Sequence, residues 1–333
     1  MEIQPGKFER IITHGDFDGL VSAALCSLAY DIERFVFTGP MAVSRSEISI
    51  DDRDIVCDLP FPLECGLWFD HHPGNREAVR LRGMDPDAIP GRFDEKPSCA
   101  RVVYDYLIKS GMEVPEYFSE TVQEADVIDS FDYDSVEAWR TETPGKLVDM
   151  SLKVYFPTPR DQTKYHKYLT LLLRGSPLDK ILDDDDVAKN LERYREEERR
   201  MIEFIEKSVS FLPEDENKEI IVLDFTHHKR RPRVLKNLAY LAYPDALGVL
   251  TLNPLFRGGR KTTDFSVSMS LSMNMTGRDH GKDIGEIMRS LDIGDGHIGA
   301  AAGTMHCSSK DEMLRSKKRI LVEIWKLWIS MPG

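Results

Sequence analysis

Apolar runs that end in aspartate or histidine recur within residues 1–130, and this pattern leaves few folds open to the chain. The polar segments at the ends of these runs are HGDFDG (14–19), VCDLP (56–60), FDHH (69–72) and EADVID (124–129). In open α/β sheets, ligands bind beyond the carboxyl ends of the strands. The sequence therefore predicts a polar site assembled from segments that are far apart along the chain.

The first part of the chain is predicted to be an α/β fold with a parallel sheet. Short buried strands are expected at 8–13, 34–38, 54–57 and 66–69, and helices at 20–29, 100–109 and 119–128. Strands that alternate with helices in this way are typical of parallel sheets.

A length of 333 residues is too great for one small core, so we expect two lobes. The expected boundaries are a first domain at 1–186, a helical linker at 187–213 and a smaller α/β domain at 214–333. Residues 145–212 read as helical throughout. For the last domain we expect strands at 219–225, 247–253 and 265–273, helices at 234–242, 283–291 and 311–329, and a turn at Gly294-Asp295-Gly296.

Charge and cysteine usage limit the partners and the compartment. Lys and Arg number 44 against 57 Asp and Glu, a net charge of −13, and such a surface repels long polyanions. A small phosphorylated substrate is not excluded, because it needs positive charge only locally. Five cysteines without CxxC spacing indicate reduced thiols. With no signal peptide and no apolar stretch long enough to span a membrane, we expect a cytoplasmic protein.

The clustered acids at the predicted strand ends indicate a divalent metal site. Several carboxylates at one edge would raise one another's pKa and cost stability unless cations lay between them. Oxygen ligands with a few imidazoles suit Mn²⁺ or Mg²⁺ better than Zn²⁺. In an extended segment His14, Asp16 and Asp18 share one face. Taken singly, each acid is more often a turn residue or a helix cap than a ligand, but their joint appearance favours the metal site.

The ligand assignment follows the order of the segments. His14 and Asp16 would hold one ion, and Asp18 would reach a second. Asp58 would bridge the two ions. The second ion would be completed by His71 and Asp126, so that four carboxylates balance two dications.

These segments resemble the motifs of the DHH phosphoesterases, a family that includes RecJ-type exonucleases, nanoRNase-type oligoribonucleases and family II pyrophosphatases. The matching stretches are THGDFDGLVSAAL, VCDLP, FDHHPGN and EADVIDSFDY, together with DIGEIMRSLDIGDGHIGAAAG, which is similar to the glycine-rich end of the DHH-associated C-terminal domain. The resemblance implies two lobes with a cleft, two Mn²⁺ ions (with Mg²⁺ as the alternative) in the first lobe, and a substrate held by the second.

The resemblance also implies roles for further residues. Asp70 would orient a ligand, and His72 would face the scissile phosphate. In the fourth motif Asp129 and Asp132 lie close to Asp126, which leaves the choice among them open.

In the second lobe the resemblance places substrate binding at the glycine-rich stretch. Gly294 and Gly296 would present backbone N–H groups to an anion, and His297 would contact a terminal phosphate. Asp295 stands where the family commonly has glycine. The strand FSVSMSLSMN lacks an arginine that nucleotide-cleaving members commonly carry, and Arg257, Arg260 and Lys261 are candidates to replace it.

The favoured function is an Mn²⁺-dependent phosphoesterase that hydrolyses a short oligonucleotide or a nucleoside bisphosphate by a metal-bridging hydroxide. Two metals about 3.5–4 Å apart can share a water and lower its pKa toward neutrality. The alternatives are a phosphoanhydride hydrolase, similar to exopolyphosphatases or pyrophosphatases, and a non-catalytic nucleotide-binding sensor. No membrane partner is expected. Trp325 and Trp328 on the last helix indicate either packing or an interface, so a homodimer is compatible with the sequence.

Overall fold

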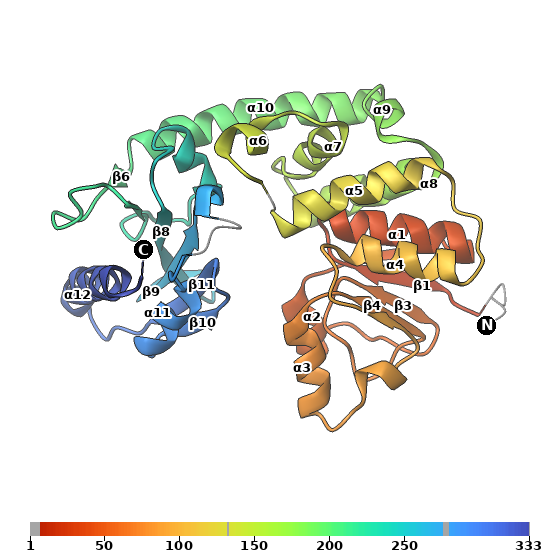
Figure 1. Ribbon diagram of the computed structural model, residues 1–333, viewed down its shortest axis with the longest axis horizontal. Helices are drawn as coiled ribbons and strands as arrows, with labels where there is room; N and C mark the ends of the chain where they lie inside the picture. Colours follow the sequence, from red (N-terminus) through yellow and green to blue (C-terminus); the bar gives the residue numbers. More distant parts are fainter. Residues whose placement is uncertain (1–6, 132, 276–279, 333) are drawn as a thin grey trace. The chain divides into compact units, whose positions relative to one another are not determined.

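The computed structural model describes residues 7–131, 133–275 and 280–332. These residues form two compact units, whose elements Figure 1 draws in colours that follow the residue number. Unit 1 comprises 1–132 and 142–195, and unit 2 comprises 133–141 and 196–333. The boundary between them falls inside one helix, α10 (Asp185–Glu206).

The sheet of unit 1 has five parallel strands, which confirms the predicted α/β class. Their spatial order is β2 (Phe35–Phe37), β1 (Arg10–Thr13), β3 (Asp54–Cys57), β4 (Leu67–Asp70) and β5 (Gly91–Phe93). Thr13, Cys57 and Phe69 are neighbours in register across the three central strands. The polar segments that follow them therefore leave the sheet at one edge.

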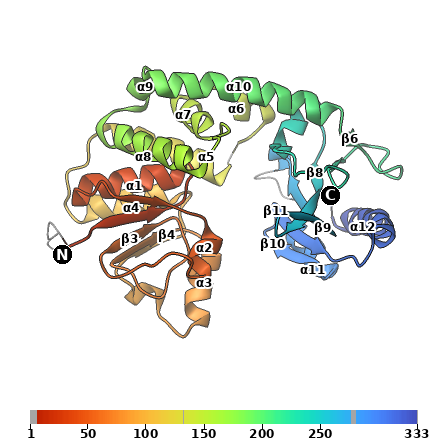
Figure 2. The ribbon, with the colours of Figure 1, turned by 180° about the vertical axis from the view of Figure 1, so that it is seen from behind.

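Helices cover both faces of this sheet, as Figures 1 and 2 show from opposite sides. The helices of unit 1 are α1 (Phe17–Tyr30), α2 (Pro40–Ser44), α3 (Pro73–Leu81), α4 (Cys99–Lys109), α5 (Tyr117–Ser130), α7 (Pro144–Leu152), α8 (Pro159–Gly175) and α9 (Leu178–Ile181), with a 3₁₀ turn η1 (Pro86–Ala88). Ile11 and Ile55 pack in one core with α1, α4 and α8, whereas Ile12 and Val56 pack on the other face with α2 and α3. The alternation follows from the two-residue period of a strand.

The acidic run at 183–186 begins a helix, as the sequence predicts. Asp184 Oδ1 accepts the backbone N–H groups of Asp186 and Val187 at 3.0 and 3.1 Å, and this satisfies donors that the start of α10 leaves unpaired. The expectation of helix as far as 212 was wrong at its end, where Val209–Ser210 forms the short strand β6. There the chain pairs with a strand of unit 2 and supplies its backbone hydrogen bonds to the sheet.

Unit 2 contains a mixed sheet of six strands. Their order is β10 (Gly294–Gly296), β11 (Ala300–Met305), β9 (Arg260–Leu271), β8 (Gly248–Arg257), β7 (Ile220–Asp224) and β6. In this sheet, among the described residues, only the β7–β8 pair is parallel. Helices α11 (Ile284–Ser290) and α12 (Lys310–Ser330) pack on one face, where Val267 and Trp328 belong to the core. Trp325 packs against the same core, so both tryptophans have a packing role within the unit.

Shorter elements complete unit 2. They are α6 (Val136–Arg140), η2 (Lys236–Leu241) and η3 (Met273–Met275). The α-helix expected at 234–242 is the shorter 3₁₀ segment η2. Its Tyr240 is fully buried and directs its hydroxyl to the Ser270 carbonyl oxygen of β9 at 3.3 Å, so the segment is fixed by the sheet below it.

The turn expected at Gly294–Gly296 was wrong, because these residues form β10 and pair with β11. The two glycines allow the backbones of β10 and β11 to approach closely. A Cβ on Gly294 would lie 2.0 Å from the Ala302 carbonyl oxygen, and one on Gly296 would lie 2.4 Å from the Ala301 Cα. Neither glycine needs a left-handed conformation. No described helix is long and apolar enough to span a membrane.

Candidate metal centre

The loop between β1 and α1 brings His14 and Asp16 together. Asp16 is the N-cap of α1 and accepts the Gly19 N–H at 3.0 Å through Oδ1. Its other oxygen lies 2.6 Å from His14 Nδ1. Burial alone would raise the pKa of Asp16, but the hydrogen bond with His14 and the His14 charge outweigh it and lower the pKa. One oxygen of the Asp16 carboxylate therefore caps α1, while the other faces His14 and is placed to bind an ion.

Asp18 lies in the first turn of α1 and is 2 % exposed. Its two oxygens accept the N–H groups of Ala100 and Cys99, at 2.7 and 2.8 Å, from the start of α4. Burial raises the pKa of Asp18 well above its usual value, and the nearby charges of Asp129 and Asp16 add to the effect. The α4 N-terminus stabilises the carboxylate only in part, so the site favours a cation beside it.

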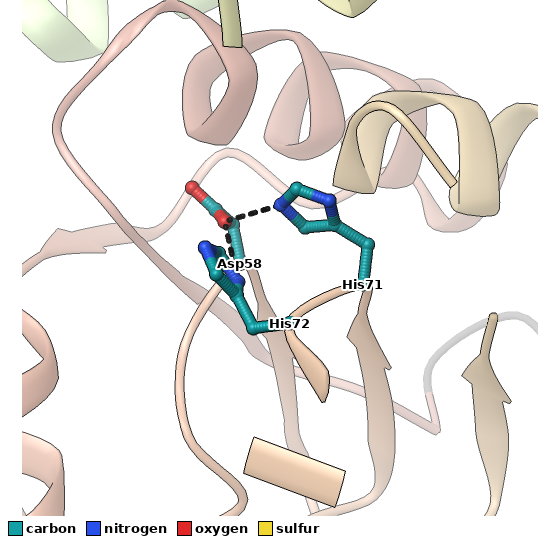
Figure 3. A group of neighbouring side chains, drawn as sticks. All are labelled: Asp58, His71 and His72. Atoms are coloured by element: carbon teal, nitrogen blue, oxygen red, sulfur yellow. Dashed lines mark ion pairs between the residues drawn. The ribbon is translucent and has the colours of Figure 1, made fainter. Parts of the chain in front are cut away.

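Asp58 lies among three imidazoles just after β3. Its φ of 55° is left-handed, and its N–H donates to the Phe69 carbonyl oxygen at 3.0 Å. Its oxygens are 3.7 Å from Nδ1 of His14, from Nε2 of His71 and from Nδ1 of His72. Figure 3 shows the two FDHH histidines pointing toward this carboxylate. These separations exceed hydrogen-bond length and leave room for an ion.

Burial raises the pKa of Asp58 well above its usual value, and repulsion from the charges of Asp18 and Asp16 raises it further. The carboxylate is 3 % exposed. A cluster of this charge needs compensation to remain ionised in the folded protein.

His71 presents a buried ring nitrogen toward the acids. Its Nδ1 lies 2.9 Å from the Lys96 carbonyl oxygen, which assigns the proton to Nδ1 and leaves the Nε2 lone pair available. Nε2 is buried and has no hydrogen-bond partner in the described part of the chain. It lies 3.3 Å from Asp129 Oδ2 and 3.9 Å from Asp18 Oδ2. An uncompensated acceptor at this depth is costly, and a metal ion would satisfy it.

Asp70 holds His72 in place. The carboxylate is fully buried and accepts the His72 Nδ1–H and the His71 backbone N–H, both at 2.9 Å, through Oδ1. Its Oδ2 accepts the Asn75 amide at 2.7 Å. The hydrogen bond to Asp70 raises the pKa of His72 against the opposing effect of burial. The His72 side chain is half exposed, so it can meet a ligand at the rim of the cluster.

The fourth polar segment reaches the cluster through Asp129 and not through Asp126. Asp126 Oδ2 accepts two hydrogen bonds from Arg101, at 2.9 and 2.6 Å, and its Oδ1 accepts the Ser98 hydroxyl at 2.7 Å. Asp129 lies one turn further along α5 and faces His71. The sequence offered no sign of the Arg101 partner, and Asp132, the third candidate, lies outside the described residues.

Three groups of potential ligands result among the described residues, each with its ligand atoms within 4.8 Å of one another. They are His14, Asp16 and Asp58; Asp18, His71 and Asp129; and Asp58, His71 and His72. The donors are carboxylates and imidazoles, which suit Mn²⁺ and Mg²⁺. The donor chemistry and the orphaned His71 Nε2 therefore fit a divalent metal centre.

Apart from His72, the residues expected to bind substrate lie in unit 2. His297 is exposed in the loop between β10 and β11, and its N–H donates to the Ala300 carbonyl oxygen at 2.8 Å. Lys261 donates to the Thr226 carbonyl oxygen at 2.5 Å. Arg257 and Arg260 face each other at the exposed end of the β8–β9 hairpin. The three cationic candidates therefore lie at or near one end of the sheet of unit 2.

A parallel sheet with an acidic edge, followed by a mixed sheet with a glycine-rich strand, is a two-domain fold that this chain shares with several solved structures. A pGpG-specific phosphodiesterase, PggH from Vibrio cholerae, is similar with a TM-score of 0.70 and 22% identity, over 96% of this chain and 99% of that one. No family model matches the chain, and no curated protein matches it.

Two further solved structures share the fold at lower similarity. RecJ from Thermus thermophilus in complex with Mn²⁺ has a TM-score of 0.54 and 15% identity, over 96% of this chain and 52% of that one. The DHH domain of a protein described as a member of a ribosomal protein family has a TM-score of 0.54 and 11% identity, over 98% of this chain and 88% of that one. This chain spans about half the length of that RecJ.

Proposed function

We propose that this protein is a divalent-metal-dependent phosphodiesterase that hydrolyses a short linear oligonucleotide. The observation that carries the proposal is the buried Nε2 of His71, which has no hydrogen-bond partner in the described chain and points at carboxylates from three separate segments. A purely structural cluster would pair such an atom, because an unsatisfied buried acceptor destabilises the fold.

The ligands divide between two ions that share the region around Asp58. His14, Asp16 and Asp58 would hold one, and Asp18, His71 and Asp129 would hold the other, with Asp58 close to both groups. This proposal gives Asp129 the role expected of Asp126. Bound Mn²⁺ or Mg²⁺ would lower the pKa of a water nucleophile and offset charge on the phosphate.

His72 has the position and protonation needed to contact a phosphate oxygen. The Asp70 carboxylate raises its pKa, so more of the ring carries a proton near neutral pH and can donate a hydrogen bond to an anion. Asp70 touches His72 from behind and acts as a positioning residue. We also propose His297, Gly294 and Gly296 as a contact region for the terminal phosphate in unit 2, since His297 is exposed there.

The charge of the protein and its fold both favour a small substrate. A net charge of −13 opposes long nucleic acids, whereas a dinucleotide requires few cationic contacts. PggH, which shares the fold over nearly its whole length, is described as specific for pGpG, and we therefore take pGpG as the first substrate to test. RecJ with the same fold is described in complex with Mn²⁺ and with Mg²⁺, so both ions belong in the assay.

The test measures hydrolysis by the purified protein with Mn²⁺ or Mg²⁺. Four substrates are compared: pGpG, an oligoribonucleotide longer than pGpG, inorganic polyphosphate, and pyrophosphate. We expect GMP from pGpG and slower action on the longer chain and on the phosphoanhydrides. Asp58→Asn should abolish turnover, and Lys326→Met on the exposed side of α12 should not alter it. If protein with confirmed metal occupancy cleaves no phosphodiester, the proposal fails.

A further inference from the structure

One face of the unit 2 sheet is lined by small hydroxyl side chains. Phe265, Val267 and Met269 of β9 belong to the core beneath α11 and α12. The alternate residues Ser266 and Ser268 therefore lie on the opposite face, where both are half-buried.

The neighbouring strands place small side chains beside Ser266 and Ser268 on this face. Ser268 pairs in register with Ala302 of β11 on one side and with Thr251 of β8 on the other. Ser266 likewise pairs with Thr304. Residues paired across strands share a face, and Ala302 is small and exposed there, so its side chain leaves the β11 side of Ser268 uncovered.

A lysine from another element lies on this face. Lys236, the first residue of η2, donates from Nζ to the Ser268 hydroxyl oxygen at 3.1 Å. Burial lowers the pKa of Lys236 to about 8. Across the described ranges no carboxylate lies within 4.0 Å of its Nζ, whereas Lys317 in the same unit is paired with Asp224 at 2.6 Å. A desolvated ammonium without a counterion costs free energy until an anion joins it.

The Ser268 hydroxyl is a second hydrogen-bond donor beside the Lys236 ammonium. Because the Ser268 oxygen accepts from Lys236, the Ser268 proton is directed toward another acceptor. Beside it, Thr251 donates to the Ser268 carbonyl oxygen at 3.4 Å, and Asn253 donates to Thr251 at 3.1 Å, which holds the underlying side chains in fixed orientations. The Lys236 ammonium and the Ser268 hydroxyl are therefore adjacent donors, with Nζ 3.1 Å from Oγ.

The nearest acid in register does not cancel this positive charge. Asp295 of β10 pairs with Ala302, but its carboxylate is bound by Arg289 at 2.7 Å. The charge of Asp295 is thereby offset at the edge of the sheet, and the face around Ser268 remains suited to an anion.

We infer that Lys236 and Ser268 form a phosphate-binding site on this face of unit 2, open beside Ala302. The anion that it takes is a phosphate group with at least two free oxygens, one for each donor. That the phosphate belongs to the substrate rests on the proposed function, whereas the binding of phosphate itself does not. The roles are binding roles, and neither residue is given a part in bond breaking.

The first experiment isolates the site from the metal centre. Protein stripped of metal with EDTA is titrated with inorganic phosphate, and the acetylation rate of Lys236 is followed by mass spectrometry of the digested protein. Phosphate should protect Lys236 at least tenfold and leave the exposed Lys326 unprotected. Ser268→Ala should weaken the protection about three- to tenfold. Equal acetylation of Lys236 with and without phosphate would overturn the inference.

The second experiment separates the inference from the proposed function. Lys236→Met should raise the KM for pGpG about tenfold with kcat within threefold of wild type, while Lys236→Arg should restore most of the affinity and Lys326→Met should match wild type. An unchanged KM for Lys236→Met in an active enzyme overturns the inference and leaves the phosphodiesterase intact. Phosphate protection in a protein that cleaves nothing supports the site and rejects the proposed function. Thermal unfolding of each variant controls for misfolding.

Discussion

His71 Nε2 lies 3.3 Å from Asp129 Oδ2, although the two residues come from different segments, one after a strand and the other within a helix. This pair links α5 to the edge of the parallel sheet. Because Nδ1 of His71 is engaged by the Lys96 carbonyl oxygen, the nitrogen that faces Asp129 is the one with the free lone pair. The pair therefore supports a shared metal rather than a simple ion pair.

Asp129→Asn should remove a ligand. We expect the affinity for Mn²⁺ at one site to fall at least tenfold and kcat to fall at least 100-fold, since ligand loss disrupts the charge balance of the centre. Calorimetric Mn²⁺ titration and pGpG turnover measure the two effects.

Asp126→Asn is the matched variant on the same helix. It breaks the hydrogen bonds from Arg101 and leaves a half-buried guanidinium without its carboxylate, so the free energy of unfolding should fall by about 1–3 kcal/mol. Mn²⁺ affinity should stay within threefold of wild type. If Asp126→Asn loses the ion and Asp129→Asn keeps it, the assignment of Asp129 is wrong.

Asp70→Asn tests the positioning of His72. An asparagine keeps the side-chain size but removes the negative charge that raises the His72 pKa, so the ring should be protonated less at neutral pH. We expect kcat for pGpG to fall about tenfold or more while both Mn²⁺ ions stay bound. NMR titration of the His72 ring should show its pKa lowered relative to wild type. Retention of full kcat with a lowered His72 pKa would remove His72 from the account.

His166 predicts how stability depends on pH. It is 1 % exposed, neither ring nitrogen has a hydrogen-bond partner within the described ranges, and burial lowers its pKa to about 4. The unfolded chain binds the proton more readily, with a pKa near 6.5, so stability is full above about pH 6.5 and is lost as the pH falls toward 4.

The loss should amount to at most about 3 kcal/mol for this residue. Urea unfolding at pH 7 and pH 5 measures it. His166→Leu, which carries no titratable group, should flatten the difference between the two pH values. An identical pH dependence in His166→Leu would show that His166 is protonated equally in both states.

The parallel sheet and its polar edge could be predicted because each depends on local pattern. The apolar runs before His14, Asp58 and Asp70 have strand length, and the register of Thr13, Cys57 and Phe69 brings their ends together. That α/β prediction is confirmed.

The choice between Asp126 and Asp129 could not be made from the sequence. Both aspartates lie on one helix at a spacing of three residues, and either could face the sheet. The contact that engages Asp126 away from the cluster is with Arg101 on α4, a tertiary partner whose position depends on how α4 and α5 pack.

The glycine-rich stretch was misread for a related reason. Glycines predict turns, but here the absence of Cβ atoms allows β10 to approach β11 closely, a requirement set by a strand that the sequence analysis did not predict. Lys236 was missed because its partner, Ser268, is a common residue in a distant strand. Only the packing of η2 against β9 shows that the two meet.

The two-metal centre is tested most directly by the stoichiometry of Mn²⁺ binding, measured by calorimetry on metal-free wild-type protein and on metal-free Asp58→Asn. We expect two Mn²⁺ per wild-type chain, with loss of at least one ion and of nearly all turnover in Asp58→Asn. Wild-type protein that binds no Mn²⁺, or an Asp58→Asn variant that binds two ions as tightly as wild type, would contradict it.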